Sequence, residues 1–177
     1  NFFSLALRCT FFDGSIEHLR AVSESVDIPV LCKDFIVSEY QLFEACIAGA
    51  DAVLLIVAAL DQQMLLQLLR RVELLGMAAL VEVHDLGELE RAIRAEASIV
   101  GVNNRNLRTL EVVVETSESL IKHVPNTIVS VAESGLGDQA SVLALRDIGY
   151  KGFLIGEALM SSASPGLALS EFVQGTT

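Results

Sequence analysis

Short apolar runs rich in β-branched residues alternate with helical patterns along the chain, and this alternation constrains the fold more than any other feature. From Ile28 onward the runs begin roughly every 20–30 residues, about the length of one strand–helix unit. The strand candidates are 28–32, 52–57, 78–83, 98–103, 127–132 and 152–156, with 5–9 as a further candidate near the start. Strands that alternate with helices predict a parallel sheet covered by helices.

Residues that favour helix ends lie between these runs. Serine, threonine and aspartate accept hydrogen bonds from the free N–H groups at a helix start, and glycine often follows the last turn. The predicted starts are at Ser15, Ser38, Asp61, Asp85, Thr116, Asp138 and Ser164-Pro165. One predicted helix therefore separates each pair of neighbouring strand candidates from 28–32 onward.

Two architectures fit such a chain: a doubly wound open sheet and a (β/α)₈ TIM barrel. An open sheet often carries a G-x-G-x-x-G turn after its first strand and shows a topological switch, and the sequence displays neither. The near-regular repeat favours the barrel. Because 177 residues suffice for one domain with a sizeable core, we expect a single TIM-barrel domain over residues 1–177.

The composition is both apolar and acidic. Hydrophobic residues make up 52% of the chain, but its longest apolar run, 52–60, is too short to span a membrane. The net charge of −11, with no basic cluster, argues against nucleic acid as a partner. The 3 cysteines and 3 histidines are scattered, which indicates no disulfide framework and no metal site. We expect a protein of a reducing, cytoplasmic compartment without a membrane partner.

Polar residues stand at the carboxyl ends of several predicted strands. In a parallel sheet these ends lie on one rim, and side-chain alternation turns four of the residues toward the interior. The four are Lys33, Glu82, Asn103 and Glu133. Each alone could be a strand-end ion pair or a turn cap. Together an amine, an amide and two carboxylates predict a catalytic pocket, because buried charges persist where chemistry needs them.

Glycines precede helices after the last two predicted strands. Gly135 and Gly137 follow Glu133, and Gly156 ends the run 152–156. Such loops present backbone N–H groups to anions, and TIM barrels commonly hold a phosphate after strands seven and eight. Ordinary turn glycines are the alternative explanation. Counting back from strand eight leaves no first strand, so we expect a phosphate-binding barrel that lacks its first βα unit.

A series of stretches between Phe11 and Leu169 carries a more specific signal. They are FFDGSIEHLRAV, PVLCKDFIV, YQLFEA, GADAVLLIVAAL, LVEVHD, GVNNRNLRTLEV, VAESGL and GFLIGEALM. In this order they resemble the indole-3-glycerol phosphate synthases, a (β/α)₈ family of tryptophan biosynthesis. The combination of CKDF, NNRNL and IGEALM makes another phosphate-binding barrel, such as a sugar-phosphate isomerase, a weaker alternative.

The resemblance implies a carbon–carbon lyase of the carboxy-lyase type. Its substrate, 1-(2-carboxyphenylamino)-1-deoxyribulose 5-phosphate, would undergo ring closure, decarboxylation and dehydration to indole-3-glycerol phosphate. The resemblance implies neither a metal nor an organic cofactor. It makes a small phosphorylated molecule the main partner, with other tryptophan-pathway enzymes as further candidates. A plastid location is open if the source is a photosynthetic eukaryote.

The resemblance also assigns roles to single positions. Lys33 corresponds to the general acid of ring closure, and Glu82 to a glutamate that transfers protons in later steps. Asn103 and Glu133 correspond to further positions of the catalytic set that orient the substrate. The remaining matches are Arg105 and Ser134 for the substrate, Phe35 for its anthranilate ring, and Gly135, Gly156 and Glu157 for the phosphate.

The first residues depart from the family pattern. Where the family has a sequence such as SVLTEP, this chain has SLALRC, with Leu7 and Arg8 in place of a threonine and an acidic residue. Nothing matches the first strand of the family. We therefore expect an N-terminally incomplete synthase, and the alternative is a non-catalytic remnant that keeps the scaffold and at most binds phosphate.

Overall fold

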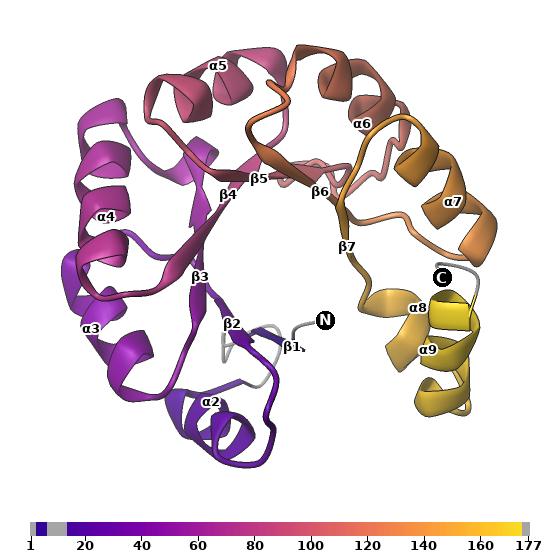
Figure 1. Ribbon diagram of the computed structural model, residues 1–177, viewed down its shortest axis with the longest axis horizontal. Helices are drawn as coiled ribbons and strands as arrows, with labels where there is room; N and C mark the ends of the chain where they lie inside the picture. Colours follow the sequence, from indigo (N-terminus) through magenta and orange to yellow (C-terminus); the bar gives the residue numbers. More distant parts are fainter. Residues whose placement is uncertain (1–2, 7–13, 175–177) are drawn as a thin grey trace. The chain divides into compact units, whose positions relative to one another are not determined.

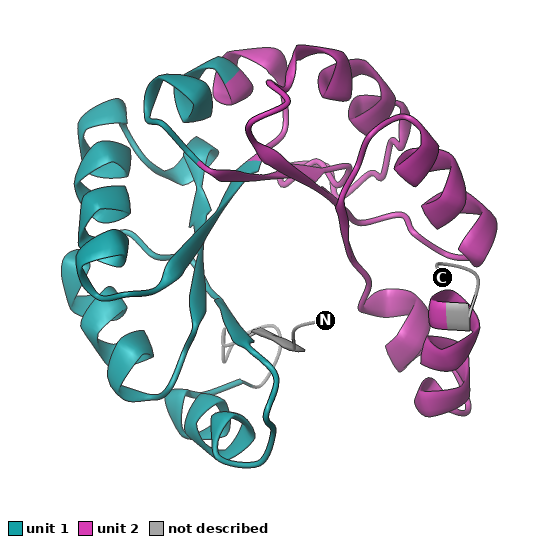
Figure 2. Cartoon of the chain, viewed as in Figure 1, with its two compact units in different colours: residues 1–82, 90–97 teal, residues 83–89, 98–177 magenta. Residues whose placement is uncertain are grey.

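The computed structural model describes residues 3–6 and 14–174 of the chain. These residues form two compact units (Figure 2): residues 1–82 with 90–97 belong to unit 1, and residues 83–89 with 98–177 to unit 2. The boundary cuts through two regular elements, strand β4 (Ala78–Val83) and helix α5 (Leu86–Arg94). The single domain expected over residues 1–177 stays a prediction.

Unit 1 contains a parallel sheet whose strands follow the order of the chain. The strands are β1 (Phe3–Ala6), β2 (Val30–Lys33), β3 (Ala52–Ile56) and β4. The register places Cys32 beside Val53, and Ile56 beside Glu82. Residues at the same level of parallel strands share a face, so Cys32 and Glu82 lie on opposite faces of this sheet.

Helices line one face of the unit 1 sheet (Figure 1). They are α2 (Ile16–Ser23), α3 (Glu39–Ile47), the 3₁₀ turn η1 (Val57–Ala59), α4 (Gln62–Leu74) and the second half of α5. Ser15 and Asp61 accept the predicted cap hydrogen bonds from backbone N–H groups, at 3.3 and 2.8 Å. Ser38 is also an N-cap residue, but its side chain makes no cap hydrogen bond; Gln41 Oε1 instead accepts from the Val37 N–H at 2.9 Å.

The core of unit 1 lies between this sheet and its helices. Cys32, Val53 and Val81 are buried on the helical face, where Leu42 and Leu68 of the covering helices are buried as well. Leu54 and Leu80 are buried on the opposite face, so the strands are apolar on both faces, as parallel strands usually are. Because both faces of the sheet are buried, polar side chains are accommodated mainly at the strand ends.

Unit 2 repeats the same plan with three parallel strands in its sheet. The strands are β5 (Ile99–Asn103), β6 (Val129–Glu133) and β7 (Gly152–Leu154), paired in chain order. The helices are α6 (Glu115–Leu120), the 3₁₀ turn η2 (Ile121–His123), α7 (Gln139–Asp147), α8 (Glu157–Met160) and α9 (Pro165–Gln174). Asp138 accepts from the Ser141 N–H at 2.8 Å, as predicted for an N-cap.

Every run from 28–32 onward that was predicted as a strand overlaps one. The strand in the run 152–156 is shorter than predicted, because Gly156 already serves as the N-cap of α8, the helix that was expected to follow this glycine. The candidate strand at 5–9 overlaps β1, which covers Phe3–Ala6, and its residues 7–9 lie outside the described part of the chain.

The predicted start of one helix is wrong. Thr116 was expected as an N-cap, but α6 begins at Glu115 with Val114 before it. Asn104, a distant residue, supplies the missing acceptor: its Oδ1 accepts from the Ser117 N–H at 3.0 Å and from the Ser117 hydroxyl at 2.8 Å. A cap that comes from another segment leaves no mark in the local sequence.

The described helices include none that is both long and apolar enough to cross a membrane. The parallel α/β arrangement predicted from the sequence is confirmed in each unit.

Candidate active site

Unit 1 brings Lys33 and Glu82 together at the carboxyl ends of two strands. Lys33 is the last residue of β2, and Glu82 precedes the last residue of β4. The Lys33 Nζ donates to Glu82 Oε2 at 3.2 Å. The Glu82 side chain is only 1% exposed, whereas that of Lys33 is 28% exposed. The pair therefore joins a buried carboxylate to an ammonium group that reaches solvent.

The register of the sheet explains this contact. Strand β3 lies between β2 and β4, and its Ile56 is level with Glu82. Side chains on this face are mostly aliphatic and buried, including Leu54 and Leu80. An ionised carboxylate in such surroundings requires a charged or hydrogen-bonding partner, which Lys33 provides. The lysine is also able to contact a ligand from its exposed side.

Phe35 follows this pair along the chain. The loop that holds it is tied by hydrogen bonds: Asp34 Oδ1 accepts from the Phe35 N–H at 2.8 Å, and Gln41 Nε2 donates to the Phe35 carbonyl at 3.0 Å. Phe35 is 38% exposed although it is a large apolar residue. An aromatic ring held on an ordered loop, and still open to solvent, is suited to packing against a ring of a ligand.

Unit 2 brings Asn103 and Glu133 together in the same way. They are the last residues of the adjacent strands β5 and β6, and the register places them side by side. Asn103 is 7% exposed and Glu133 is 1% exposed. The Asn103 Oδ1 accepts from the Arg105 N–H at 2.9 Å, which orients its amide. The expectation that this pair shares one pocket with Lys33 and Glu82 stays a prediction.

Asn104 organises the loops beside Asn103 and Glu133. Its Nδ2 donates to the Ser134 carbonyl at 3.0 Å, and its Oδ1 accepts from Ser117 in α6. Tyr150 extends this buried network, since its hydroxyl donates to the Ser117 carbonyl at 3.0 Å. The predicted site did not include Asn104. Its place directly after Asn103 was the one available signal, because both its partners lie far away in the sequence.

Arg105 and Glu157 form an ion pair in unit 2. The Arg105 Nη2 donates to Glu157 Oε2 at 2.7 Å, and Nη1 donates to the Leu110 carbonyl at 3.2 Å. Their side chains are 33% and 82% exposed. The sequence indicated both residues for binding, but it gave no sign of this contact between positions far apart in the chain.

The glycine loops differ in the space around them. Ser134 and Gly135 have positive φ angles of 65° and 77°. A Cβ on Gly135 would lie 2.6 Å from Cγ1 of Val112, so only glycine fits this close approach of two loops. Gly156, in contrast, has no heavy atom within 4 Å of its Cβ position beyond its chain neighbours. Gly156 therefore leaves room for a ligand, whereas Gly135 is required by the loop packing itself.

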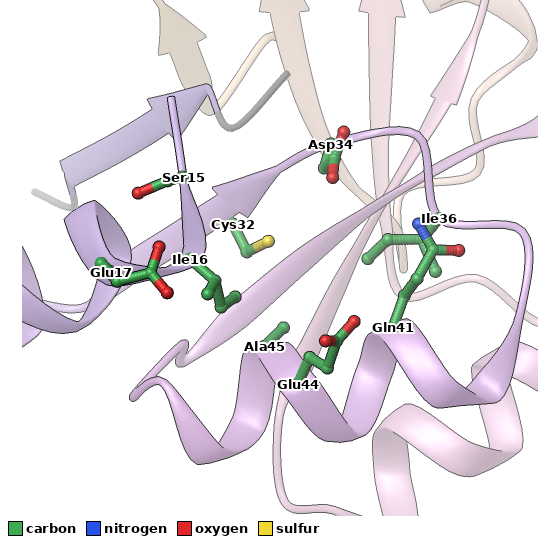
Figure 3. A pocket seen from close by; sticks show the side chains of 9 residues that line it. All are labelled: Ser15, Ile16, Glu17, Cys32, Asp34, Ile36, Gln41, Glu44 and Ala45. Atoms are coloured by element: carbon green, nitrogen blue, oxygen red, sulfur yellow. The ribbon is translucent and has the colours of Figure 1, made fainter. Parts of the chain in front are cut away.

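The outer side of β2 carries a separate groove (Figure 3). It lies between α2, β2 and α3, and is lined by Ser15, Ile16, Glu17, Cys32, Asp34, Ile36, Gln41, Glu44 and Ala45. Burial raises the pKa of the Cys32 thiol to about 12, with a smaller contribution from the Asp34 carboxylate. Cys32 is thus a protonated core residue on the helical face. None of the residues predicted for the site lines this groove.

The residue types present suit acid–base chemistry. A lysine ammonium can donate a proton, and a neighbouring carboxylate can hold it in place and accept protons in its turn. Among residues 3–6 and 14–174, no group of three or more His, Cys, Asp or Glu side chains is arranged to hold a metal ion. The expected absence of a metal stays a prediction for the complete chain.

The fold and the site define a parallel α/β protein of the TIM-barrel class with a lysine–glutamate pair at its strand ends. The 3-hexulose-6-phosphate synthase from Salmonella typhimurium has a similar structure, with a TM-score of 0.82 and 15% identity over 97% of this chain and 85% of that one. KGPDC from Streptococcus mutans has a TM-score of 0.78 and 12% identity over 98% and 84%. At these identities the likeness shows the fold alone.

Sequence comparisons identify the family within this class. A family model of indole-3-glycerol phosphate synthase matches residues 3–172. The indole-3-glycerol phosphate synthase of Delftia acidovorans is 47% identical over 161 residues, which cover 91% of this chain and 60% of that protein. That of a Parafrankia species is 51% identical over 166 residues, or 94% and 62%. The chain belongs to the indole-3-glycerol phosphate synthase family, and it spans about 60% of the length of these relatives.

Proposed function

We propose that this chain carries the chemistry of an indole-3-glycerol phosphate synthase. The reaction would be the ring closure, decarboxylation and dehydration of 1-(2-carboxyphenylamino)-1-deoxyribulose 5-phosphate. Membership of the family supports this proposal, since the relatives at 47% and 51% identity bear the name of this enzyme. The contact between Lys33 and Glu82 carries it, because an ammonium group on a buried carboxylate is the arrangement that the reaction needs.

Lys33 is the general acid in this proposal. When the aromatic carbon attacks the substrate carbonyl, negative charge develops on the carbonyl oxygen, and a proton from the Lys33 Nζ neutralises it. Glu82, 3.2 Å away, holds the ammonium group toward the substrate and accepts or returns protons when water is lost. Decarboxylation and dehydration restore an aromatic ring, so these residues mainly supply positioning and proton transfer.

The remaining residues bind and orient the substrate. Asn103 and Glu133 orient the reacting part, while Arg105 and Ser134 bind and orient the rest of the substrate. Phe35 packs against the anthranilate ring, and its 38% exposure is consistent with that role. The backbone around Gly135, Gly156 and Glu157 receives the phosphate, which favours N–H groups at loop and helix starts.

We also propose that strands β1 to β7 correspond to strands two to eight of the eight-stranded barrel. The two glycine loops that follow β6 and β7 then take the places where barrels of this class hold phosphate. A cytoplasmic or plastid compartment and an association with other tryptophan-pathway enzymes stay predictions.

The experiment is a turnover assay with the synthetic substrate. The full-length protein encoded by the gene that contains these residues should form indole-3-glycerol phosphate. Its Lys33→Met variant should form the product at least about 100-fold more slowly. The 177-residue chain should be assayed beside it. Phosphate binding without any turnover in the longer protein would refute the proposal and favour the non-catalytic scaffold.

A further inference from the structure

The ion pair between Arg105 and Glu157 has a consequence for anion binding. Both terminal nitrogens of the Arg105 guanidinium have oxygen partners in unit 2: Leu110 O at 3.2 Å and Glu157 Oε2 at 2.7 Å. The Arg105 backbone N–H is bonded to Asn103 Oδ1 at 2.9 Å. The Arg105 side chain is therefore held by hydrogen bonds at both terminal nitrogens, and a carboxylate occupies one of them.

Glu157 is a loosely held partner. Its side chain is 82% exposed, and it stands directly after Gly156, whose surroundings are open. Ion pairs with such exposed members contribute little, because water solvates the separated charges nearly as well. A doubly charged oxyanion with several acceptor oxygens competes favourably for an arginine against one carboxylate.

We propose that the Glu157 carboxylate competes with anions for the Arg105 guanidinium. It excludes anions that bind arginine weakly, and the phosphate group of the substrate displaces it. The inference rests on the proposed function for the identity of the anion. The family resemblance places Glu157 in a phosphate loop, where its backbone N–H can bind the anion. The inference concerns its side chain, whose carboxylate opposes phosphate binding. Glu157 would thereby make the Arg105 site selective for doubly charged anions over singly charged ones.

The test measures binding of inorganic phosphate by calorimetry at low ionic strength. Glu157→Gln removes both the competing charge and its repulsion of the anion, so phosphate should bind roughly three- to tenfold more tightly. Glu118→Gln is the matched control, because Glu118 is an exposed glutamate of the same unit and the substitution changes the net charge equally. Its effect should stay within about twofold, since exposed charges at a distance are screened.

Two further series make the result specific. In an Arg105→Gln background, Glu157→Gln should raise the affinity for phosphate clearly less, because without the guanidinium only the direct repulsion of the anion by the carboxylate is removed. Benzoate, a carboxylate monoanion, should gain less from Glu157→Gln than phosphate gains. Circular dichroism on every variant shows that the fold is retained.

Several results would overturn the inference. Unchanged or weaker phosphate binding by Glu157→Gln would show that the carboxylate merely positions Arg105. An equal gain in Glu118→Gln or an undiminished gain in the Arg105→Gln background would also contradict it. So would an equal gain for benzoate, or no phosphate binding by any variant. If the phosphate-binding measurements give the expected results but the turnover assay detects no product, the proposed function is wrong. The inference that Glu157 competes for Arg105 is then still supported.

Discussion

Lys33 and Glu82 are the residues on which the chemistry depends. The carboxylate is 1% exposed and lies among aliphatic side chains, and the lysine reaches it at 3.2 Å. Removing a charged group from such a pair leaves its partner in surroundings that favour the neutral form. Each residue therefore supports the charge of the other, and single substitutions should act on both.

We expect Lys33→Met to lower kcat by roughly 10²–10⁴-fold, the range that a lost general acid produces. Glu82→Gln should lower kcat as well, and the double variant should be little worse than Lys33→Met alone, because the two groups act as a unit. Steady-state kinetics on the complete enzyme measures this. Purely multiplicative effects of the two substitutions would show that the residues act independently.

Cys32 should be unreactive at neutral pH. Its pKa is raised to about 12 by burial, so almost no thiolate is present at pH 8. In a Cys9→Ser background, a thiol reagent should label Cys46, which is partly exposed, and label Cys32 only after denaturation. Mass spectrometry of the labelled peptides measures the ratio. Fast labelling of Cys32 in the folded chain would contradict its burial against the helices.

Tyr150 should make the chain sensitive to alkali. Burial raises its pKa to about 12, partly opposed by the hydrogen bond to Ser117. This lies above the value of about 10 for an unfolded chain, so its stabilising contribution is complete below pH ~10 and is lost as pH rises through about 12. Tyr150→Phe should flatten the fall in unfolding free energy over that window. An unaltered slope in denaturant titrations would assign the alkaline loss to other groups.

At the scale of elements, short hydrogen bonds at the helix starts decide where the helices begin. Asp61 caps α4 through the Met64 N–H at 2.8 Å, and Asp138 caps α7 through the Ser141 N–H at 2.8 Å. Hydrogen bonds from the Ser141 hydroxyl and, to a smaller extent, from the Ser141 N–H hold the pKa of Asp138 below its usual value. Such caps are local, and this is why the sequence predicted them.

We expect Asp61→Ala to lower the free energy of unfolding by about 1 kcal/mol, because the first turn of α4 loses its acceptor. Asp61→Asn is the matched control, since asparagine caps about as well without a charge. Urea denaturation followed by circular dichroism gives both values. Equal losses in the two variants would indicate that the charge of Asp61, and not its cap, is what stabilises the helix.

Other elements depend on contacts that local sequence does not specify. Arg91 of α5 donates to the Val57 carbonyl at 3.1 Å and so ties η1, which directly follows β3, to this helix. Asn104 caps α6 from a loop. Prediction from sequence located the strands and most helix starts, since periodicity and caps are encoded within a few residues. It misplaced the start of α6, because its acceptor lies on another segment.

At the scale of the whole molecule, the boundary between the units raises the question of cooperativity. It passes between Glu82 and Val83 within β4, and between Leu89 and Glu90 within α5. Melting of one unit would therefore disrupt elements that the other shares. This continuity favours a single unfolding transition in spite of the two units.

The two tyrosines allow this to be measured, because Tyr40 lies in unit 1 and Tyr150 in unit 2. With fluorinated tyrosine, their two ¹⁹F resonances should lose intensity at the same urea concentration. Tyr40 is 69% exposed and Tyr150 is 0% exposed, so the signals should be resolved. Midpoints that differ would show that the units unfold separately and that residues 1–177 are not one cooperative domain.

The sequence by itself determined the parallel α/β class, the approximate position of each strand from β2 onward and the residue types near the strand ends. These properties follow from local periodicity and capping. Only the tertiary structure decided which side chains meet: Lys33 with Glu82, Asn104 with Ser117, and Arg105 with Glu157. Each of these contacts joins segments that become neighbours through strand order, register and loop packing. Such contacts depend on three-dimensional distances of a few ångströms, which the spacing of residues along the chain does not encode.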